Sequence, residues 1–452
     1  MNIIIAGNGK VGTTLARRLS EEGYNLTLID SNPQVLAEIC EACDVLGVQG
    51  NCASMPVLQQ AGVADADLLI AATSQDEVNL LCCTTAHGLN SKLHTIARIR
   101  NPEYTQQIYA MRDVFALSLS VNPEKQAARE IENLLRLPGF LQRDTFAKGR
   151  TAIVELRVDK DSKLRNVLLN NLNGIVKCKV LVCAVLRDGD AITPGGNFVL
   201  REGDRIFVTA PTDNLSTLLK NLNIVTRKVR KVLLCGGGRV SLYLAELLCK
   251  DGISVSMIES NYDRCVQLAA ALPDATIIRG DATDKPLLEE HGLTGCDALV
   301  SLTGMDEMNM IISLYANTRG VPQVITKLGH TENRSISNNL SLGSVISPRE
   351  LCCDTIIRYV RAMSNFTGTA ESVHSIADGQ VEAVEFRVNQ HTQYQSIPLK
   401  DIRLRDGVLL VSITHGSVTE IPGGNSIFLE GDTIVAVTSR RGSLRQINDI
   451  FA

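Results

Sequence analysis

Tryptophan is absent from this 452-residue chain, and aromatic residues make up only 4% of it, too few to form a platform for stacking nucleic-acid bases. The formal net charge of -4 leaves no general basic face, which argues against nucleic-acid binding. No apolar run approaches the roughly 18 residues of a membrane-spanning helix. The chain opens directly on a strand-like segment rather than on a signal peptide. We therefore expect a cytoplasmic protein.

The thirteen cysteines lack the spacing of a metal site. Most of them, including the adjacent pairs 82–83 and 352–353, lie inside apolar patterns, which predicts reduced and buried thiols. Cys40 and Cys43 form a nominal CxxC, but they lie within a helical pattern with no second pair and no histidine cluster nearby. We therefore expect no metal site and no redox function at this CxxC.

The first thirty residues have an order typical of dinucleotide-binding proteins. Residues 2–6 form an apolar run that predicts a buried parallel strand. Residues 7–12 read GNGKVG and are followed by a helical pattern that ends at Gly23. A second predicted strand covers residues 24–29 and carries Asp30 at its tip. The sequence therefore predicts a phosphate-binding turn, although a purely structural glycine turn would show the same glycines.

Each residue type in this turn has a physical reason. Gly7 permits a tight turn, Gly9 lets backbone N–H groups approach a pyrophosphate, and Gly12 lets the helix pack closely on the strand. The helix directs its N–H groups and positive dipole end at the phosphate. Asp30 is placed to accept hydrogen bonds from a ribose 2′-OH. Since Ser31 rather than arginine follows Asp30, the site favours NAD, or another adenosine with a free 2′-OH, over NADP.

The chain then repeats itself at a shift near 229. Residues 232–235 repeat the first strand, residues 236–241 read GGGRVS, and Glu259 takes the place of Asp30. Each half alternates short apolar strands with helical patterns, which predicts two Rossmann-like, doubly wound parallel α/β sheets. Both halves also carry an Asp-Glu-x-Asn motif after a strand, at residues 76–79 and 306–309.

Polar positions at Asn51, Thr73 and Arg98 fall directly after predicted strands. In an open parallel sheet these strand ends face one crevice, so we expect the three positions to converge on the phosphate turn. The other interpretation is that Thr73 and Thr303 merely end their strands. The repetition leaves both open, because duplication copies structural and functional residues alike.

After each sheet comes an amphipathic helix that begins at an N-cap followed by proline, at Asn122 and at Ser347. Such a helix could cross to a partner subunit or pack on its own domain. Beyond it lies a β-rich unit of about 80 residues, which we expect to depend on dimerisation for part of its buried surface. The expected boundaries are 1–121 and 229–346 for the nucleotide domains, 122–142 and 347–367 for the connector helices, and 143–228 and 368–452 for the β-rich domains.

A nucleotide domain, a connector helix and a β-rich domain, all present twice, resemble the TrkA-type regulatory subunits of bacterial Trk potassium-uptake systems. These are built from two tandem RCK (regulator of potassium conductance) units. The match rests on residues 7–12 with Asp30, on Thr73, on residues 97–104, and on the Pro-Gly-Gly-Asn and Glu-Gly-Asp turns present in both β-rich units. It covers essentially the whole chain.

The resemblance implies a cytoplasmic protein on the inner face of a membrane potassium-translocating subunit. It also implies a homotetramer whose eight nucleotide domains form a gating ring, with NAD(H), and in some members ATP or ADP, changing the shape of the ring. The implied ligand contacts of the first repeat are Gly7, Asn8, Gly9, Lys10, Val11, Gly12, Asp30, Asn51, Cys52, Thr73 and Arg98. Those of the second are Gly236, Gly237, Gly238, Arg239, Val240, Glu259, Asp281, Ala282, Thr303 and Lys327.

One departure from the pattern is Ser241, which replaces the third glycine of the second turn. Its Cβ and hydroxyl should push the helix slightly outward. The second site is therefore expected to be weak, to bind a different nucleotide, or to be structural only.

The rival function is an NAD-dependent oxidoreductase, which needs a substrate domain and a positioned acid or base. The chain after each nucleotide domain is short and β-rich, and the seven histidines share no spacing between the halves. His94 and His330, expected near the crevice, fit helix ends or loops. We therefore expect no enzyme. A nucleotide sensor whose partner is not a transporter is the third possibility.

Overall fold

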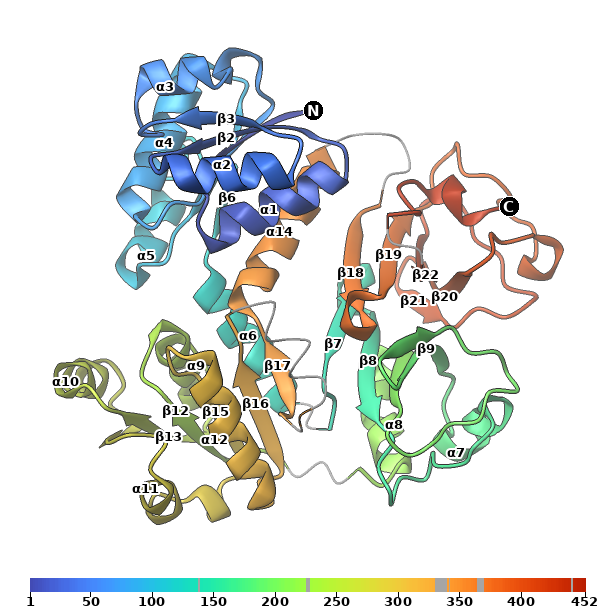
Figure 1. Cartoon of the computed structure of the whole chain (residues 1–452). Helices are drawn as coiled ribbons and strands as arrows, with labels where there is room; N and C mark the ends of the chain where they lie inside the picture. Colours follow the sequence, from blue (N-terminus) through green and yellow to red (C-terminus); the bar gives the residue numbers. More distant parts are fainter. Residues whose placement is uncertain (137–138, 225–227, 330–339, 341, 364–369, 440–441) are drawn as a thin grey trace. The chain divides into compact units, whose positions relative to one another are not determined.

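The computed structural model describes the chain except residues 137–138, 225–227, 330–339, 341, 364–369 and 440–441 (Figure 1). The chain forms two compact units. The first comprises residues 1–127 and 348–360, and the second comprises residues 128–347 and 361–452. The first nucleotide domain thus lies in one unit, and the second nucleotide domain lies in the other together with both β-rich domains.

The first unit contains a six-stranded parallel sheet with the order β3-β2-β1-β4-β5-β6. Its strands are β1 (Asn2–Ala6), β2 (Asn25–Asp30), β3 (Leu46–Gln49), β4 (Leu68–Ala71), β5 (His94–Arg98) and β6 (Leu119–Val121). Its helices are α1 (Lys10–Glu21), α2 (Pro33–Ala42), α3 (Met55–Gln60), α4 (Asp76–Leu89) and α5 (Pro102–Ala110). Strands such as β4 are buried along their whole length, as expected for a sheet covered on both faces. The strand order reverses between β1 and β4, where doubly wound sheets bind ligands.

The second unit repeats this arrangement with the order β14-β13-β12-β15-β16-β17. The strands are β12 (Lys231–Cys235), β13 (Ser254–Glu259), β14 (Thr276–Arg279), β15 (Ala298–Ser301), β16 (Gln323–Lys327) and β17 (Ser344–Ile346). The helices between them are α9 (Arg239–Lys250), α10 (Tyr262–Ala271), α11 (Lys285–Glu290) and α12 (Asp306–Thr318). The predicted pair of Rossmann-like sheets, each followed by a smaller β-rich domain, is confirmed.

Each β-rich domain is a five-stranded antiparallel sheet, with the orders β10-β9-β11-β8-β7 and β18-β19-β22-β20-β21. The strands are β7 (Arg143–Phe146), β8 (Thr151–Arg157), β9 (Leu181–Arg187), β10 (Asp190–Ile192) and β11 (Arg205–Pro211), then β18 (Ser372–Ile376), β19 (Val381–Arg387), β20 (Val408–His415), β21 (Val418–Glu420) and β22 (Thr433–Thr438). The first domain also carries helices α7 (Leu172–Val176) and α8 (Leu215–Asn221).

The two β-rich domains share one buried apolar cluster, to which Phe146, Phe207, Ile376 and Val435 contribute. Polar contacts border it, such as the backbone N–H of Ala147, which donates to the Glu385 carboxylate at 2.7 Å. The buried surface that each small domain was expected to gain by dimerisation is therefore formed within one chain.

The connector helices are α6 (Pro123–Arg136) and α14 (Pro348–Met363). Within the first unit, α14 packs against the first nucleotide domain, and Figure 1 shows it beside α1. Arg18 and Asp354 form a salt bridge of 2.7 Å, and the His94 ring is hydrogen bonded to the Tyr359 hydroxyl at 2.9 Å. A helix that follows the second sheet in sequence thus covers the first.

Within the second unit, α6 makes the reciprocal contact. The Gln323 side chain donates to the Leu134 carbonyl at 3.0 Å, and Arg136 pairs with Asp251 at 2.9 Å. Each connector therefore packs on the nucleotide domain of the other repeat in the same chain, which was not expected. The start of α6 also contacts its own nucleotide domain, as one of the two expectations had it, since Glu124 pairs with Arg100 at 2.6 Å. The helices were predicted over 122–142 and 347–367. Residues 137–138 and 364–367 of those ranges, with the expected stop at Pro138, lie outside the described residues.

Candidate nucleotide-binding site

The phosphate turn of the first repeat leads from β1 into α1. Gly7 has a φ of 92°, and a Cβ there would lie 2.8 Å from the Thr73 Cα. A Cβ at Gly12 would lie 2.0 Å from the Gly7 carbonyl oxygen, so no larger residue fits unless the turn moves. At Gly9, by contrast, a Cβ would meet no atom within 4 Å. The first and third glycines of the turn therefore leave no room for a side chain, whereas the second glycine faces open space.

Gly9 is also the N-cap of α1, and it provides no side-chain cap for the helix. Gly238 has the same role at α9. Neither helix has an acidic residue in its first turn, where Lys10 and Val11 or Arg239 and Val240 follow the cap. Both helix N-termini can therefore receive an anion.

Asp30 lies at the tip of β2 and fixes the turn from the side. One carboxylate oxygen accepts from the Asn8 backbone N–H at 2.6 Å, and the other accepts from the Asn32 N–H at 2.9 Å. The Asn8 side chain is only 3% exposed, yet neither of its polar atoms has a partner among the described residues. Because a buried amide without hydrogen bonds is costly, Asn8 is suited to bind a polar group from outside the protein.

The ends of β4 and β5 are joined by one buried side chain, Asn79 of α4. Its Oδ1 accepts from the backbone N–H and the hydroxyl of Thr73, at 2.9 and 2.7 Å, and its amide donates to the Arg98 carbonyl at 2.8 Å. The Arg98 guanidinium in turn donates to the Thr73 carbonyl at 3.0 Å. Thr73 and Arg98 are thus brought together beside Gly7. Asn79 is a site residue to which the sequence assigned no role.

Burial lowers the pKa of Arg98, and its Nε has no partner among the described residues. The adjacent loop is held by Asp76, whose carboxylate accepts from the Arg100 and Asn101 N–H groups at 2.8 and 2.7 Å. The aspartate and the asparagine of the Asp-Glu-x-Asn motif therefore both support the strand ends. Their signal in the sequence was a polar residue inside an apolar helical pattern, repeated in both halves.

The second repeat has the same network. The Thr303 backbone N–H donates to Asn309 at 2.8 Å, and Asn309 donates to the Lys327 carbonyl at 3.0 Å. The Lys327 ammonium reaches the Thr303 carbonyl at 2.6 Å, as Arg98 reaches Thr73. A lysine thus replaces the arginine at the same place, with a compact charge in place of a planar one.

Ser241 lies where the first repeat has Gly12. Its side chain is fully buried, and its hydroxyl donates to the Gly236 carbonyl oxygen, the counterpart of the atom that a Cβ at Gly12 would strike. The turn of the second repeat thus accommodates the serine and is tied to α9 by it. Sequence reasoning foresaw a steric effect and missed this bond.

Glu259 stands in for Asp30. Its carboxylate accepts from the Gly237 and Asn261 N–H groups at 2.7 and 2.8 Å. Arg264, which has no basic counterpart in the first repeat, donates to the Gly237 carbonyl at 2.8 Å. In the first repeat the Thr13 hydroxyl donates to the equivalent carbonyl, that of Asn8, at 2.9 Å. What distinguishes the second turn is therefore the Ser241 bond to Gly236 and the charge of Arg264.

The loops after β3 and β14 carry the remaining predicted residues. The Asn51 side chain accepts from the Ala53 N–H at 3.0 Å, and Cys52 is buried. In the second repeat, Asp281 accepts from the N–H and hydroxyl of Thr283, bonds that lower its pKa, and Ala282 is buried.

The expectation for His94 is wrong. His94 begins β5, whereas Arg98 ends it, so the histidine lies at the opposite edge of the sheet from the crevice. His330 lies outside the described residues.

Comparison with known proteins agrees with the fold. The TrkA-N domain model matches residues 3–115 and 232–348, and the TrkA-C domain model matches residues 153–223 and 383–452. The chain belongs to the TrkA family. The Trk system potassium uptake protein TrkA of Halomonas elongata is 29% identical over 100% of this chain and 98% of its own length. Within the described part of the chain, no helix is both long and apolar enough to cross a bilayer.

Solved structures share the fold. The GsuK RCK domain superposes with a TM-score of 0.61 at 17% identity, covering 96% of this chain and 92% of its own. The GsuK channel bound to NAD gives a TM-score of 0.60, also at 17% identity, covering 97% of this chain and 76% of its own.

Proposed function

We propose that this chain is a nucleotide-sensing regulatory subunit that controls a membrane potassium transporter or channel from the cytoplasmic side. The observation that carries the proposal is an open phosphate turn at the strand-order reversal of each parallel sheet, in a chain of the TrkA family. Its relatives are named as potassium uptake proteins, which supports the nature of the partner. By the same resemblance, four copies form the gating ring.

We infer NAD(H) as the first ligand, with ATP or ADP as the alternative. Asp30 offers a carboxylate to a ribose with a free 2′-OH, and α1 offers an N-terminus without a side-chain cap to the phosphates. The buried Asn8 amide and Arg98 Nε supply donors that the protein does not use. That the GsuK channel was solved with NAD supports this choice of ligand.

The proposed role is regulatory rather than catalytic. Hydride transfer needs an acid or base beside the nicotinamide. The carboxylates near the crevice, Asp30 and Asp76, each accept two backbone N–H groups, and we assign Asp30 to the ribose, so neither is assigned as the acid or base of a hydride transfer.

The mechanism we propose is a population shift, in which the ligand prefers one shape of the ring and moves it only by its differential affinity for the two shapes. The contacts of α14 give the shift a route within the first unit. Asp354 binds Arg18 of α1, and the Cys353 thiol contacts the Val11 carbonyl at 3.8 Å. A ligand that moves the start of α1 would therefore displace α14, which precedes the second β-rich domain in the sequence.

We further propose that the first site is the principal sensor and that the second mainly braces the ring. Ser241 and Arg264 already occupy hydrogen-bonding positions at the second turn. The two sites are thus proposed to differ in their affinity for the nucleotide, although their domains share the same fold.

The test has two parts. Calorimetric titration of the intact chain with NAD, NADH, ATP and ADP should show binding, with NADPH weaker than NADH. Potassium flux into vesicles that contain the membrane partner should then change when nucleotide is added with the wild-type chain, and not with Gly9→Val. If the chain bound none of these nucleotides, the proposed function would be refuted.

A further inference from the structure

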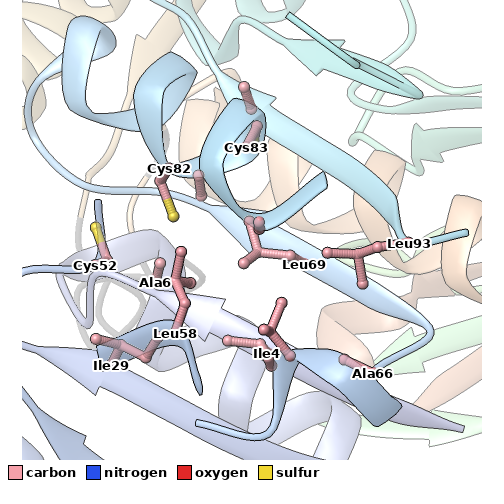
Figure 2. Packing of buried hydrophobic residues seen from close by; sticks show 14 of the residues in the cluster. Ile4, Ala6, Ile29, Cys52, Leu58, Ala66, Leu69, Cys82, Cys83 and Leu93 are labelled. Carbon is pink, nitrogen blue, oxygen red and sulfur yellow. The ribbon is translucent and has the colours of Figure 1, made fainter. Parts of the chain in front are cut away.

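Two cysteine side chains lie in the same buried cluster of the first nucleotide domain. Cys52 follows β3, and Cys82 lies on α4, one turn beyond Asn79. Figure 2 shows both sulfur atoms at the same end of the cluster. The interaction between the two thiols lowers the pKa of Cys52, and the same interaction together with burial raises the pKa of Cys82.

The pair is placed where the ligand is expected. The loop from β3 begins at Gly50, whose N–H donates to the Asp30 carbonyl at 2.9 Å. Cys52 is therefore close to the carboxylate that we assign to the ribose, and it retains 5% of its exposure whereas Cys82 is fully buried. We therefore expect a small oxidant to reach Cys52 before Cys82.

Other buried thiols lack this arrangement. The adjacent Cys83 donates to the Ile96 carbonyl at 3.7 Å, away from Cys52, and burial raises its pKa to about 12. Burial likewise raises the pKa of Cys183 to about 12. A thiol that stays protonated is a poor nucleophile toward peroxide, so we expect these cysteines to react with it more slowly than Cys52.

The second repeat shows that the fold does not require the pair. Ala282 and Ile312 occupy the positions of Cys52 and Cys82, and both are buried in the matching core. Packing alone is thus satisfied by alanine and isoleucine. The thiol pair belongs only to the first repeat, the one that we propose as the sensor.

We propose that Cys52 and Cys82 form a redox-sensitive dithiol that peroxide converts to a disulfide, which weakens nucleotide binding at the first site. The part of this proposal that concerns the ligand rests on the proposed function. Formation of the disulfide does not.

The chemistry balances with hydrogen peroxide as oxidant. The Cys52 thiolate attacks one peroxide oxygen, the O–O bond breaks, and Cys52 becomes a sulfenic acid as hydroxide leaves and takes up the thiol proton to become water. The Cys82 sulfur then attacks the Cys52 sulfur, the S–O bond breaks, and a second water leaves with the Cys82 proton. Two thiols lose two electrons in total, and one peroxide becomes two waters.

The disulfide would move the crevice wall. A covalent bond holds two sulfurs at about 2.05 Å, well inside a thiol–thiol contact, so the loop at residues 50–53 must shift toward α4. Cys52 is also an assigned ligand contact. Oxidation should therefore lower the affinity for NADH, and bound NADH should in turn cover Cys52 and slow its oxidation.

The experiment treats the intact reduced chain with graded hydrogen peroxide, with and without saturating NADH. Peptide mass mapping locates any cross-link, and titration then measures NADH affinity. Cys82→Ser is the test variant, and Cys83→Ser is the matched control, since serine already stands at the equivalent position, Ser313. Both should bind NADH like the wild type while reduced.

We expect the wild type and Cys83→Ser to form the 52–82 cross-link, to lose at least tenfold in NADH affinity, and to recover it with dithiothreitol. NADH should slow the cross-linking at least tenfold. Cys82→Ser should form no cross-link, and its Cys52 should carry added oxygen instead. Peroxide that oxidises other cysteines before this pair, or a cross-link that leaves NADH affinity unchanged, would overturn the proposal. Failure of the reduced chain to bind nucleotide would refute the proposed function, whether or not the cross-link forms.

Discussion

The two phosphate turns of this chain share a backbone plan and differ in how it is held. In the first, Asp30 reaches the turn N–H at 2.6 Å; in the second, the longer Glu259 reaches the equivalent N–H at 2.7 Å. The acid can therefore change length without changing its contact. At the third glycine the repeats diverge, because Gly12 leaves no room for a side chain while Ser241 bonds the turn.

What the repeats keep is as informative as what they change. Thr73 with Asn79 and Thr303 with Asn309 make the same hydrogen bonds to within about 0.1 Å. This network belongs to the architecture of the strand ends. The differences lie around the phosphate turn, where they alter how much of the turn remains for a ligand.

The largest expected effect comes from Gly9→Val. The new side chain points into space that is open to at least 4 Å, so the fold should survive, but that space is where the phosphates are proposed to lie. NADH binding at the first site should disappear in calorimetry while thermal unfolding stays close to that of the wild type. Unchanged affinity in a folded variant would refute the assignment of the turn.

Asp30→Ala should come next. Loss of a charge-assisted hydrogen bond costs about 1.5–3 kcal/mol, or roughly ten- to a hundredfold in NADH and ATP affinity, because both carry an adenosine ribose. NADPH should gain relative to NADH. Glu259→Ala is the matched variant and should change the tight binding little. A wild type that already prefers NADPH would contradict this interpretation of Asp30.

The connector helices differ in a group that titrates. Burial, with Asp144 nearby, raises the pKa of Glu130 on α6 to about 7, against the favourable charges of Arg143 and His374. The equivalent position on α14 is Thr355. Because of the raised pKa, Glu130 keeps its proton to a higher pH in the folded state than in the unfolded state. The contribution of Glu130 to folding stability is therefore complete below the unfolded pKa of about 4.3 and is lost as pH rises through about 7.

Denaturant unfolding of the wild type from pH 5 to 8 should therefore show stability falling by at most about 1.4 kcal/mol per pH unit until the pH exceeds the folded pKa. Glu130→Gln should flatten that slope. Thr355→Val is the control and should leave it in place. A slope that persists in Glu130→Gln would assign the dependence to another group.

The smallest effect is expected from Ser241→Gly. Loss of the bond to Gly236 frees the second turn to approach the form of the first, so NADH affinity at the second site should rise a few-fold, worth less than about 1 kcal/mol. The reverse change, Gly12→Ser, should weaken the first site, since its Cβ would be 2.0 Å from a carbonyl oxygen. A rise in NADH affinity at the second site in Ser241→Gly and a fall at the first site in Gly12→Ser would support the contrast between the two turns. A fall in affinity in both variants would contradict it.

The sequence alone predicted the parts of the fold that depend on local pattern. The apolar run of β1, the glycines, the acid after β2 and the repetition identify two doubly wound sheets, and strand order brings Thr73 and Arg98 to the turn. The placement of His94 failed because it requires knowing which end of a short strand a residue occupies. The binding roles of the assigned residues and the domain boundaries stay predictions.

The exchange of connector helices was beyond sequence reasoning. The apolar stripe of α14, in which Ile356 and Ile357 are buried, shows that one face of the helix is covered. It does not show which domain covers that face. The contacts of Asp354, Tyr359 and Cys353 in the structure identify the first nucleotide domain as the covering surface. The exchange also means that separate halves of the chain would each lose a packing partner, so binding tests need the intact protein.

The central claim is that one chain holds a principal nucleotide site in its first repeat and a weaker one in its second. The most direct test is calorimetric titration of NADH into the intact wild type and into Gly238→Val, which fills the same open space at the second turn. We predict one tight site per chain in both proteins, with only the weaker phase lost in the variant. Loss of the tight phase in Gly238→Val would contradict the account.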